Sequence, residues 1–207
     1  IFTHDSVGLG QDGPTHQPVE QESQIRLMEH LKNHHGDNSM LVLRPADSLE
    51  TNVAWKLALE NKKTPTALIL SRQNIKDLPS DSNNRFNDAL QAENGAYIVQ
   101  DCTGKPDVIL LASGSEVATL VESALLLRKS NLQVRIISAP SEGLFRNQSE
   151  GYKKSTIPDD IPVFGLTAGL SVTLQGLVGP RGKVWGLNSF GFSAPYKVLD
   201  EKFGFTP

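Results

Sequence analysis

Short, strongly apolar runs alternate along the chain with longer segments in which apolar residues recur every three or four positions. The run from Thr66 to Ser71 is too uniformly apolar to alternate between core and solvent, which is typical of strands in parallel sheets. The pattern predicts strands over residues 41–44, 66–71, 96–101, 107–112, 134–138, 162–167 and 183–187. Because strands alternate with helices, we expect an α/β fold whose mostly parallel sheets are covered by helices.

Three helices stand out from their periodicity and their capping residues. A helix over 48–60 is predicted because Asp47 can cap its first turn and Glu50 completes a capping box. The longest helix, over 115–130, has apolar residues along one face. The last helix is expected to open at Ser193, because serine caps well and the proline that follows is tolerated in a first turn.

A polar stretch divides the chain into two successive α/β units. Residues 76–94 are rich in aspartate, asparagine and serine, which is the composition of a linker or a long connection. We therefore expect a first domain over 1–93 and a second over 94–207. Residues 1–4 read as the end of a strand that enters a loop. The first unit is thus expected to be truncated at its N-terminus, in a fragment of a longer protein.

Composition excludes several classes of function. The chain has 207 residues and a formal net charge of −3, with its basic residues scattered, so neither nucleic acid nor a membrane surface is an expected partner. No apolar stretch approaches the roughly 20 residues that cross a bilayer. Cys102 is the only cysteine, which rules out a disulfide framework and a cysteine metal cluster. A reducing, cytoplasmic setting is the default expectation.

The segment from Thr3 to Pro18 carries the candidate chemistry. Three glycines and two prolines in these sixteen residues predict a tightly turned loop, and two histidines and two aspartates lie on it. Loops that follow strand ends in α/β sheets are common ligand sites. A helix is expected to start near His16, which would place this imidazole at the positive end of the helix. The simpler alternative is that these side chains only cap turns.

The order of residues in this loop, THDSVGLGQDGPTHQP, resembles the substrate-binding loop of transketolases. The resemblance continues along nearly the whole chain, in segments that keep their order. They are Leu43–Asp47, Val53–Lys56, Thr66–Asn74 (which ends in SRQN), Ala112–Val117 and Phe190–Pro195. It implies the second half of a pyrimidine-binding domain followed by a transketolase C-terminal domain.

The resemblance also implies an activity and a role for individual residues. Transketolases move a two-carbon ketol unit from a ketose phosphate to an aldose phosphate in the pentose phosphate pathway. His16 would be catalytic and contact the sugar oxygens near the reacting bond, and Asp12 would accept a hydrogen bond from a sugar hydroxyl. His4 and Arg72 would bind the distal phosphate, for which a guanidinium offers paired donors. Asp5 is expected to hydrogen-bond within the loop, and the alternative for Arg72 is a surface ion pair.

The same resemblance implies thiamine diphosphate, with Mg²⁺ or Ca²⁺, as cofactors of the full-length homodimer. The family's Gly-Asp-Gly motif, which binds the metal and the diphosphate, does not occur in this chain. The chain alone is therefore expected to bind neither cofactor nor metal and to be inactive. Two positions depart from the family pattern, since Thr167 and Gln11 stand where an acid is common.

Two alternative functions remain open from the sequence. The chain could belong to another thiamine diphosphate enzyme, such as deoxyxylulose-phosphate synthase or dihydroxyacetone synthase. It could also be a noncatalytic chain with a role in assembly or regulation.

Two further motifs have a structural and a functional interpretation. His30 and His34 have the i, i+4 spacing of a zinc-binding pair, but their polar surroundings favour a solvated helix end. Gly114-Ser115-Glu116 could present helix amides to an anion, and simple helix capping is favoured.

Overall fold

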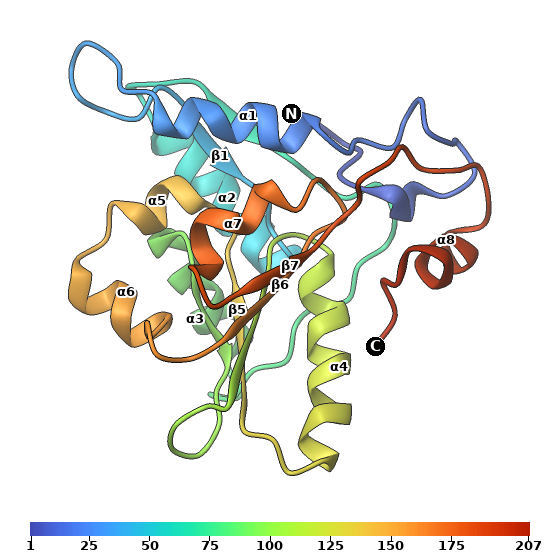
Figure 1. Ribbon diagram of the computed structural model, residues 1–207. Coiled ribbons are helices and arrows are strands. Elements are labelled where there is room, and N and C mark those ends of the chain that lie inside the picture. Colours follow the sequence, from blue (N-terminus) through green and yellow to red (C-terminus); the bar gives the residue numbers. More distant parts are fainter.

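The computed structural model describes residues 1–207 and arranges the strands in two sheets (Figure 1). The smaller sheet pairs β1 (Leu41–Leu43) with β2 (Thr66–Leu68) in parallel. Phe2 extends this sheet, because it forms a parallel bridge with Ile69. The start of the chain therefore lies beside β2 and runs in the same direction.

The larger sheet contains five strands in the order β3-β5-β4-β6-β7. They are β3 (Tyr97–Gln100), β4 (Val108–Ala112), β5 (Val134–Ser138), β6 (Val163–Leu166) and β7 (Lys183–Trp185). Only β3 runs antiparallel, along β5, and the other neighbours are parallel. The expected α/β fold with mostly parallel sheets is confirmed, although β2 and β7 end earlier than predicted.

Helices cover both faces of the larger sheet because its strands are apolar on both sides. Along β4, Leu110 packs in a core with Leu120 of α4 (Glu116–Lys129), whereas Ile109 and Leu111 pack in a second core on the opposite face. The second core is closed by α5 (Glu142–Arg146), α6 (Glu150–Thr156) and α7 (Val172–Val178). Figure 1 shows α4 across the strands from α5 and α6.

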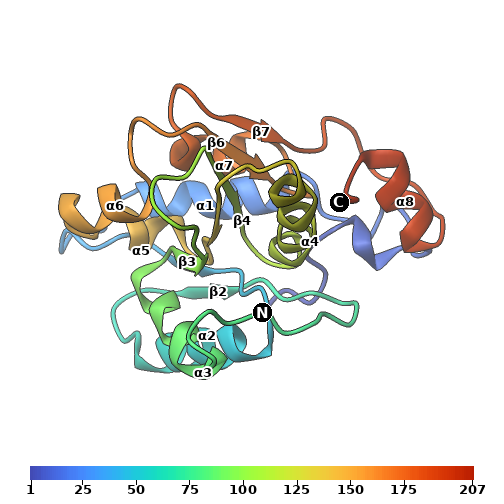
Figure 2. The same cartoon turned by 90° about the horizontal axis from the view of Figure 1, so that it is seen from below.

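The two units pack as one body. The core cluster under α4 also contains Ala46 and Val53 from the first unit, the latter on α2 (Ser48–Glu60). Buried polar contacts cross the same junction, since the Tyr97 hydroxyl donates to Glu50 at 2.6 Å. Figure 2 shows β2 and α2 beneath the larger sheet, with α3 beside them. None of the helices is long and apolar enough to cross a membrane.

Of the two alternatives predicted for the polar stretch over 76–94, a linker or a long connection, the structure shows a long connection between β2 and β3. It contains α3 (Arg85–Leu90) and the short 3₁₀ helix η2 (Gln91–Asn94). The side chain of Asn84 caps α3 by accepting from the amide of Asn87. Polar residues here form turns and caps, and their composition alone does not distinguish this use from a flexible connection.

Helix α2 was predicted correctly, but two other helix starts were not. The side chain of Asp47 accepts from the amide of Glu50 at 2.8 Å and caps α2 as expected. The last helix, α8 (Tyr196–Phe203), begins after Pro195 without a side-chain cap. Ser193 does not cap it, because its hydroxyl donates to the carbonyl oxygen of Gln11 in the first loop.

The helix expected near His16 begins later in the chain. Helix α1 spans Gln21–His30, and His16 lies in a turn before it. The cause is Gln17, whose side-chain amide donates to the carbonyl oxygens of Gly10 at 2.8 Å and Phe192 at 3.0 Å. These hydrogen bonds connect the loop to residues before α8. They engage the residue that directly follows His16, so this part of the chain does not join α1. His16 therefore receives no benefit from a helix N-terminus.

Candidate active site

The candidate residues emerge from one edge of the smaller sheet. Phe2 donates its amide to Leu68 at 2.8 Å and accepts from the amide of Leu70 at 2.8 Å. His4 and Arg72 follow these two parallel segments and leave the sheet at their carboxyl ends. Ligands of α/β proteins bind in this position, outside the carboxyl ends of the strands.

The first loop folds back so that its two histidines meet. It contains the short 3₁₀ helix η1 (Val7–Leu9), followed by Gly10 with φ +83° and Gly13 with φ +77°, values that favour glycine. The ring centroids of His4 and His16 are 6.0 Å apart. The sequence placed both histidines on one loop, and the structure brings their rings together.

Each imidazole is oriented by the threonine that precedes it. Nδ1 of His4 lies 3.0 Å from the Thr3 hydroxyl, and Nδ1 of His16 lies 3.0 Å from the Thr15 hydroxyl. These contacts leave Nε2 of both rings available to a ligand. An imidazole with one nitrogen engaged can present its other nitrogen as a donor or an acceptor near neutral pH.

The other two candidates, Asp12 and Arg72, are exposed and form no hydrogen bond or ion pair with the histidine pair. Asp12 and His16 are both exposed on the loop, while His4 is half-buried. Arg72 is also exposed and forms no ion pair, so the alternative of a surface ion pair does not apply to it. The structure thus brings the rings of His4 and His16 side by side, and it places Arg72 after the neighbouring parallel segment.

Beneath the loop lies a buried charge cluster that the sequence analysis did not identify. Nη2 of Arg44, which follows β1, is 2.9 Å from Asp5 Oδ2 and 2.7 Å from Glu116 Oε2. Asp5 was expected to bond within the loop, and only its contact from the Ser6 hydroxyl does so. One feature of the sequence pointed to this cluster, because an arginine directly follows a buried strand in the Leu43–Asp47 segment.

Burial dominates the electrostatics of this cluster. Desolvation raises the pKa of Glu116 to about 7, and the attraction of Arg44 only partly opposes it. Arg44 keeps its charge, because nearby carboxylates raise its pKa and outweigh its own desolvation. One guanidinium is shared here among Asp5, Glu22 and Glu116. The raised pKa therefore places the titration of Glu116 near neutral pH.

The Gly114-Ser115-Glu116 segment does not serve as a simple helix cap. Ser115 has helical φ and ψ values and makes no side-chain capping bond. Its hydroxyl donates to Asp5 Oδ2 at 3.3 Å, and Glu116 bonds to Arg44. The favoured capping interpretation is therefore wrong, because both side chains face the charge cluster.

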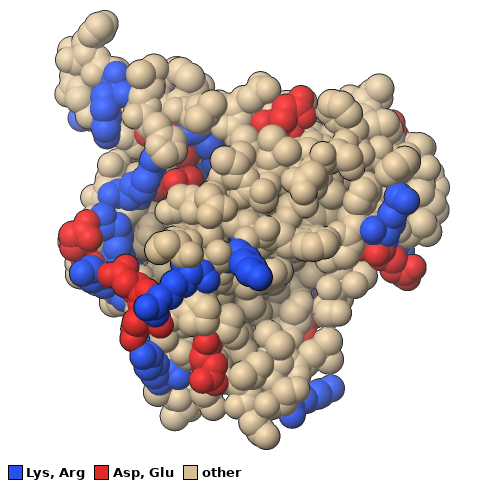
Figure 3. Space-filling model, viewed as in Figure 1, with Lys and Arg blue, Asp and Glu red and all other residues tan.

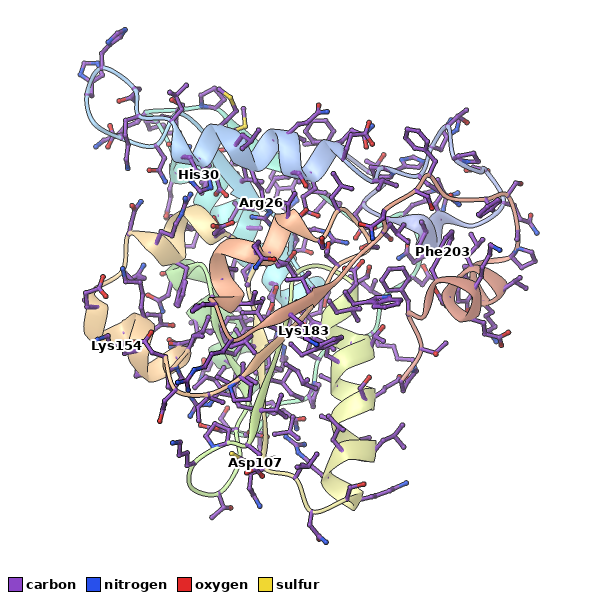
Figure 4. All side chains as sticks on the ribbon, in the orientation of Figure 1. Arg26, His30, Asp107, Lys154, Lys183 and Phe203 are labelled. Atoms are coloured by element: carbon purple, nitrogen blue, oxygen red, sulfur yellow. The ribbon has the colours of Figure 1, made fainter.

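The histidines outside the loop do not form a metal site. Helix α1 ends at His30, and the chain then reverses through a bridge between Lys32 and Asn38, so His30 and His34 share no helix face. Figure 4 shows His30 at the end of α1, where its Nε2 lies 2.9 Å from Nη1 of Arg146. No cluster of three histidine, cysteine or acidic side chains is arranged to hold a metal ion.

Charged side chains of both signs are interspersed on the surface. In Figure 3 they gather over the side of the molecule that carries α5 and α6, and few lie over the side of the first loop. A polyanion would require a continuous basic surface, and this face does not present one.

Fold and geometry together describe an α/β protein with polar candidate residues at the carboxyl ends of its strands, a common position for ligands. A family model described as "Transketolase-like TK C-terminal domain" matches residues 95–206, and one described as "Transketolase, pyrimidine binding domain" matches residues 1–77. The chain therefore belongs to the transketolase family.

Relatives and solved structures agree with this assignment. Transketolase 2 of Aliivibrio fischeri is 42% identical over 207 residues, which are 100% of this chain and 29% of that protein. The structure of transketolase from Leishmania mexicana matches with a TM-score of 0.84 at 37% identity, over 99% of this chain and 28% of that one. A Pichia stipitis transketolase mutant, described as a complex with xylulose 5-phosphate, matches with a TM-score of 0.84 at 35% identity. The match covers 99% of this chain and 28% of that one.

Proposed function

We propose that this chain forms a substrate-binding wall of a transketolase, which transfers a two-carbon ketol unit from a ketose phosphate to an aldose phosphate in the pentose phosphate pathway. The observation that carries the proposal is the pair of imidazoles at the carboxyl edge of the strands, 6.0 Å apart, in a chain of this family. Because the chain spans 29% of the length of the curated relative, the activity is that of a longer enzyme.

His16 is the proposed catalytic residue. It is exposed, and the Thr15 hydroxyl beside Nδ1 leaves Nε2 to face a sugar oxygen. Breaking the bond between C2 and C3 of a ketose moves charge and protons among the oxygens on these carbons. A neutral imidazole can donate to an oxygen that gains charge, and it can accept a proton from a hydroxyl.

His4 and Arg72 are proposed to bind the phosphate at the far end of the sugar. They follow adjacent parallel segments, so their side chains can approach one anion from two sides. Arg72 offers paired donors and is not neutralised by a carboxylate. The Pichia stipitis structure described with xylulose 5-phosphate supports a phosphorylated sugar as the ligand.

Asp12 is proposed to select among sugars by their hydroxyl groups. A carboxylate accepts hydrogen bonds only, so it rewards a hydroxyl of the correct configuration and penalises its absence. Asp12 lies between Gly10 and Gly13, whose positive φ values fix the turn on which it stands. Its position is therefore set by the backbone of the loop.

Thiamine diphosphate and Mg²⁺ or Ca²⁺ complete the proposal, in a cytoplasmic homodimer. When bound, the cofactor would supply the nucleophilic carbon that ketol transfer requires. The side chains of this chain include no cluster suited to a metal, so we assign the cofactor and its metal to other parts of the enzyme. The proposed domains are residues 1–93 and 94–207, and the family matches over 1–77 and 95–206 support this division.

A coupled assay with xylulose and ribose phosphates tests the proposed function. The enzyme is prepared at the full length of its relatives, with this chain as its carboxyl-terminal part. We expect ketol transfer, and a decrease in kcat of roughly 10² to 10⁴-fold in the His16→Ala variant, the range typical of a lost acid–base group. His35→Ala is the matched control, because His35 is exposed and follows the far end of α1, whose start follows the loop.

Two results would contradict the proposal. An enzyme without ketol transfer between these sugars would favour another thiamine diphosphate enzyme or a noncatalytic chain. Equal effects of the His16 and His35 substitutions would remove the catalytic role of His16.

A further inference from the structure

Arg44 has no part in the proposed reaction, yet it is among the most buried side chains of the protein, with 0% exposure. It follows β1, and its Nη1 atom donates to the carbonyl oxygen of Ser113 in the second unit at 3.0 Å. Its Nη2 atom donates to Asp5 Oδ2 at 2.9 Å and to Glu116 Oε1 at 2.9 Å. Arg44 therefore connects the first loop to the second unit.

Asp5 joins the two segments that carry the proposed phosphate ligands. Its Oδ2 atom accepts from the Ser71 hydroxyl at 2.9 Å. Asp5 is the residue after His4, and Ser71 is the residue before Arg72. This part-buried contact thus fixes the backbone beside one phosphate ligand relative to the backbone beside the other.

Glu116 anchors the same cluster in the carboxyl-terminal unit. It is the first residue of α4, and its Oε1 atom also accepts from the amide of Ala168, after β6, at 3.1 Å. The Ser115 hydroxyl reaches Asp5 from the same helix start. Two side chains of the second unit therefore contact the support of the substrate loop.

Stability alone is a weak explanation for this arrangement. Buried ion pairs rarely stabilise a fold more than apolar residues of similar volume would, because the charges must be desolvated. Three carboxylates around one guanidinium make the desolvation cost larger still. What a buried polar network that links several segments does supply is a fixed geometry, and ligand contacts need to be placed within a fraction of an ångström.

We propose that Asp5, Arg44 and Glu116 are positioning residues that set the spacing of His4 and Arg72, so that the carboxyl-terminal unit determines affinity for phosphorylated sugars. The inference rests on the proposed function. It gives the second unit a part in substrate recognition, although none of its side chains is assigned to the substrate.

The test compares KM for a phosphorylated aldose acceptor with KM for an unphosphorylated one, in the full-length enzyme. Glu116→Gln keeps the shape of the side chain and weakens its electrostatic interaction with Arg44. We expect KM for the phosphorylated acceptor to rise about tenfold, with kcat within about twofold and KM for the unphosphorylated acceptor unchanged, because only ground-state phosphate contacts are lost. Ser115→Ala removes a smaller contact and is expected to give a smaller rise in the same KM.

Glu50→Gln is the matched control. Glu50 is equally buried at the junction of the two units and bonds to Tyr97, but it makes no contact with the first loop or with Ser71. We expect it to lower the melting temperature without changing the ratio of the two KM values. A purely structural role for Glu116 would make the two variants alike.

The outcomes separate this inference from the proposed function. Arg72→Ala must raise KM for the phosphorylated acceptor; if it does not, the proposed phosphate site is wrong. If Arg72→Ala behaves as expected but Glu116→Gln and Ser115→Ala leave both KM values unchanged, or raise both equally, the positioning role is overturned while the proposed function stands. A Glu116→Gln enzyme that does not fold leaves Ser115→Ala to decide.

Discussion

His4 and His16 lie side by side but are held in different ways. His4 is half-buried and precedes Asp5, which is bonded to three other segments of the chain. His16 is exposed on a turn that Gln17 holds from one side. A fixed imidazole suits a group that binds a phosphate, and a more exposed one suits a group that exchanges protons with the substrate. Their surroundings thus support the division of roles that we propose.

The raised pKa of Glu116 makes stability depend on pH. Burial raises this pKa from 4.5 to about 7, so between these values the folded protein holds a proton that the unfolded chain has released. The free energy of unfolding must therefore fall as pH rises from 4.5 to 7, by on the order of 2 to 3 kcal/mol at about 1.4 kcal/mol per pKa unit. Arg44 and Asp5 are the charged groups that act on Glu116, and Glu22 pairs with Arg44 from its other side.

Urea unfolding at pH 5 and pH 7.5 measures this effect against the Glu116→Gln variant, which cannot titrate there. Wild-type stability should fall relative to the variant as pH rises. The control is Glu122→Gln, because Glu122 lies on the same helix with a side chain that is 53% exposed. Parallel pH profiles of wild type and Glu116→Gln would contradict the prediction.

The sequence points to the candidate site residues more clearly than to the buried residues that support them. His4 and His16 could be found because a short glycine-rich loop carries both, and local spacing is visible in a sequence. Arg44 could not be recognised as the centre of a cluster, because its partners Asp5 and Glu116 are 39 and 72 positions away. Contacts between such distant segments arise from the packing of the two units.

Among the elements, strands were predicted more accurately than helix starts. A strand such as β5 is specified by its own apolar residues, and its predicted bounds are those of the structure. The starts of α1 and α8 depend on the hydrogen bonds that the side chains of Gln17 and Ser193 make. Both side chains form hydrogen bonds between the first loop and the segment before α8. Capping rules consider only residues near the helix start, so they do not include such distant partners.

The start of α4 offers a test of how closely the two units approach each other. Gly114 has φ +64°, and a Cβ atom there would lie 2.5 Å from Nε of Arg44. Gly104 has φ +82° with no neighbouring atom within 4 Å. Replacing either glycine with alanine strains the backbone by about 1 to 2 kcal/mol. Gly114→Ala should lose about 1 to 3 kcal/mol more, because the added methyl group displaces Arg44.

Equilibrium unfolding in urea of the two alanine variants measures the difference directly. Gly104→Ala is the control for backbone strain, since it lacks the contact. Equal losses of stability would mean that Arg44 adjusts without cost and that the junction is looser than the structure indicates.

At the scale of the whole molecule, the two units share a core and several buried polar contacts. Arg44 bonds to Glu116, Tyr97 bonds to Glu50, and the Ser141 hydroxyl donates to Glu29 of α1 at 3.1 Å. Arg26 of α1 pairs with Glu29 in the same region, and Figure 4 shows Arg26 on the side of α1 that faces α7. Separating the units would expose these charges and the apolar residues beside them.

This shared junction predicts that the two units unfold together. The two tryptophans report on different units, since Trp55 lies on α2 and Trp185 on β7. Variants with Trp55→Phe or Trp185→Phe retain one fluorophore each, and both are partly exposed, so the substitutions disturb the core little. Their fluorescence should change at the same urea concentration, in coincidence with circular dichroism, as in a two-state transition. Two separate transitions would show that each unit is stable alone, and the contacts through Arg44 would then be too weak to transmit a change in the second unit to the substrate loop.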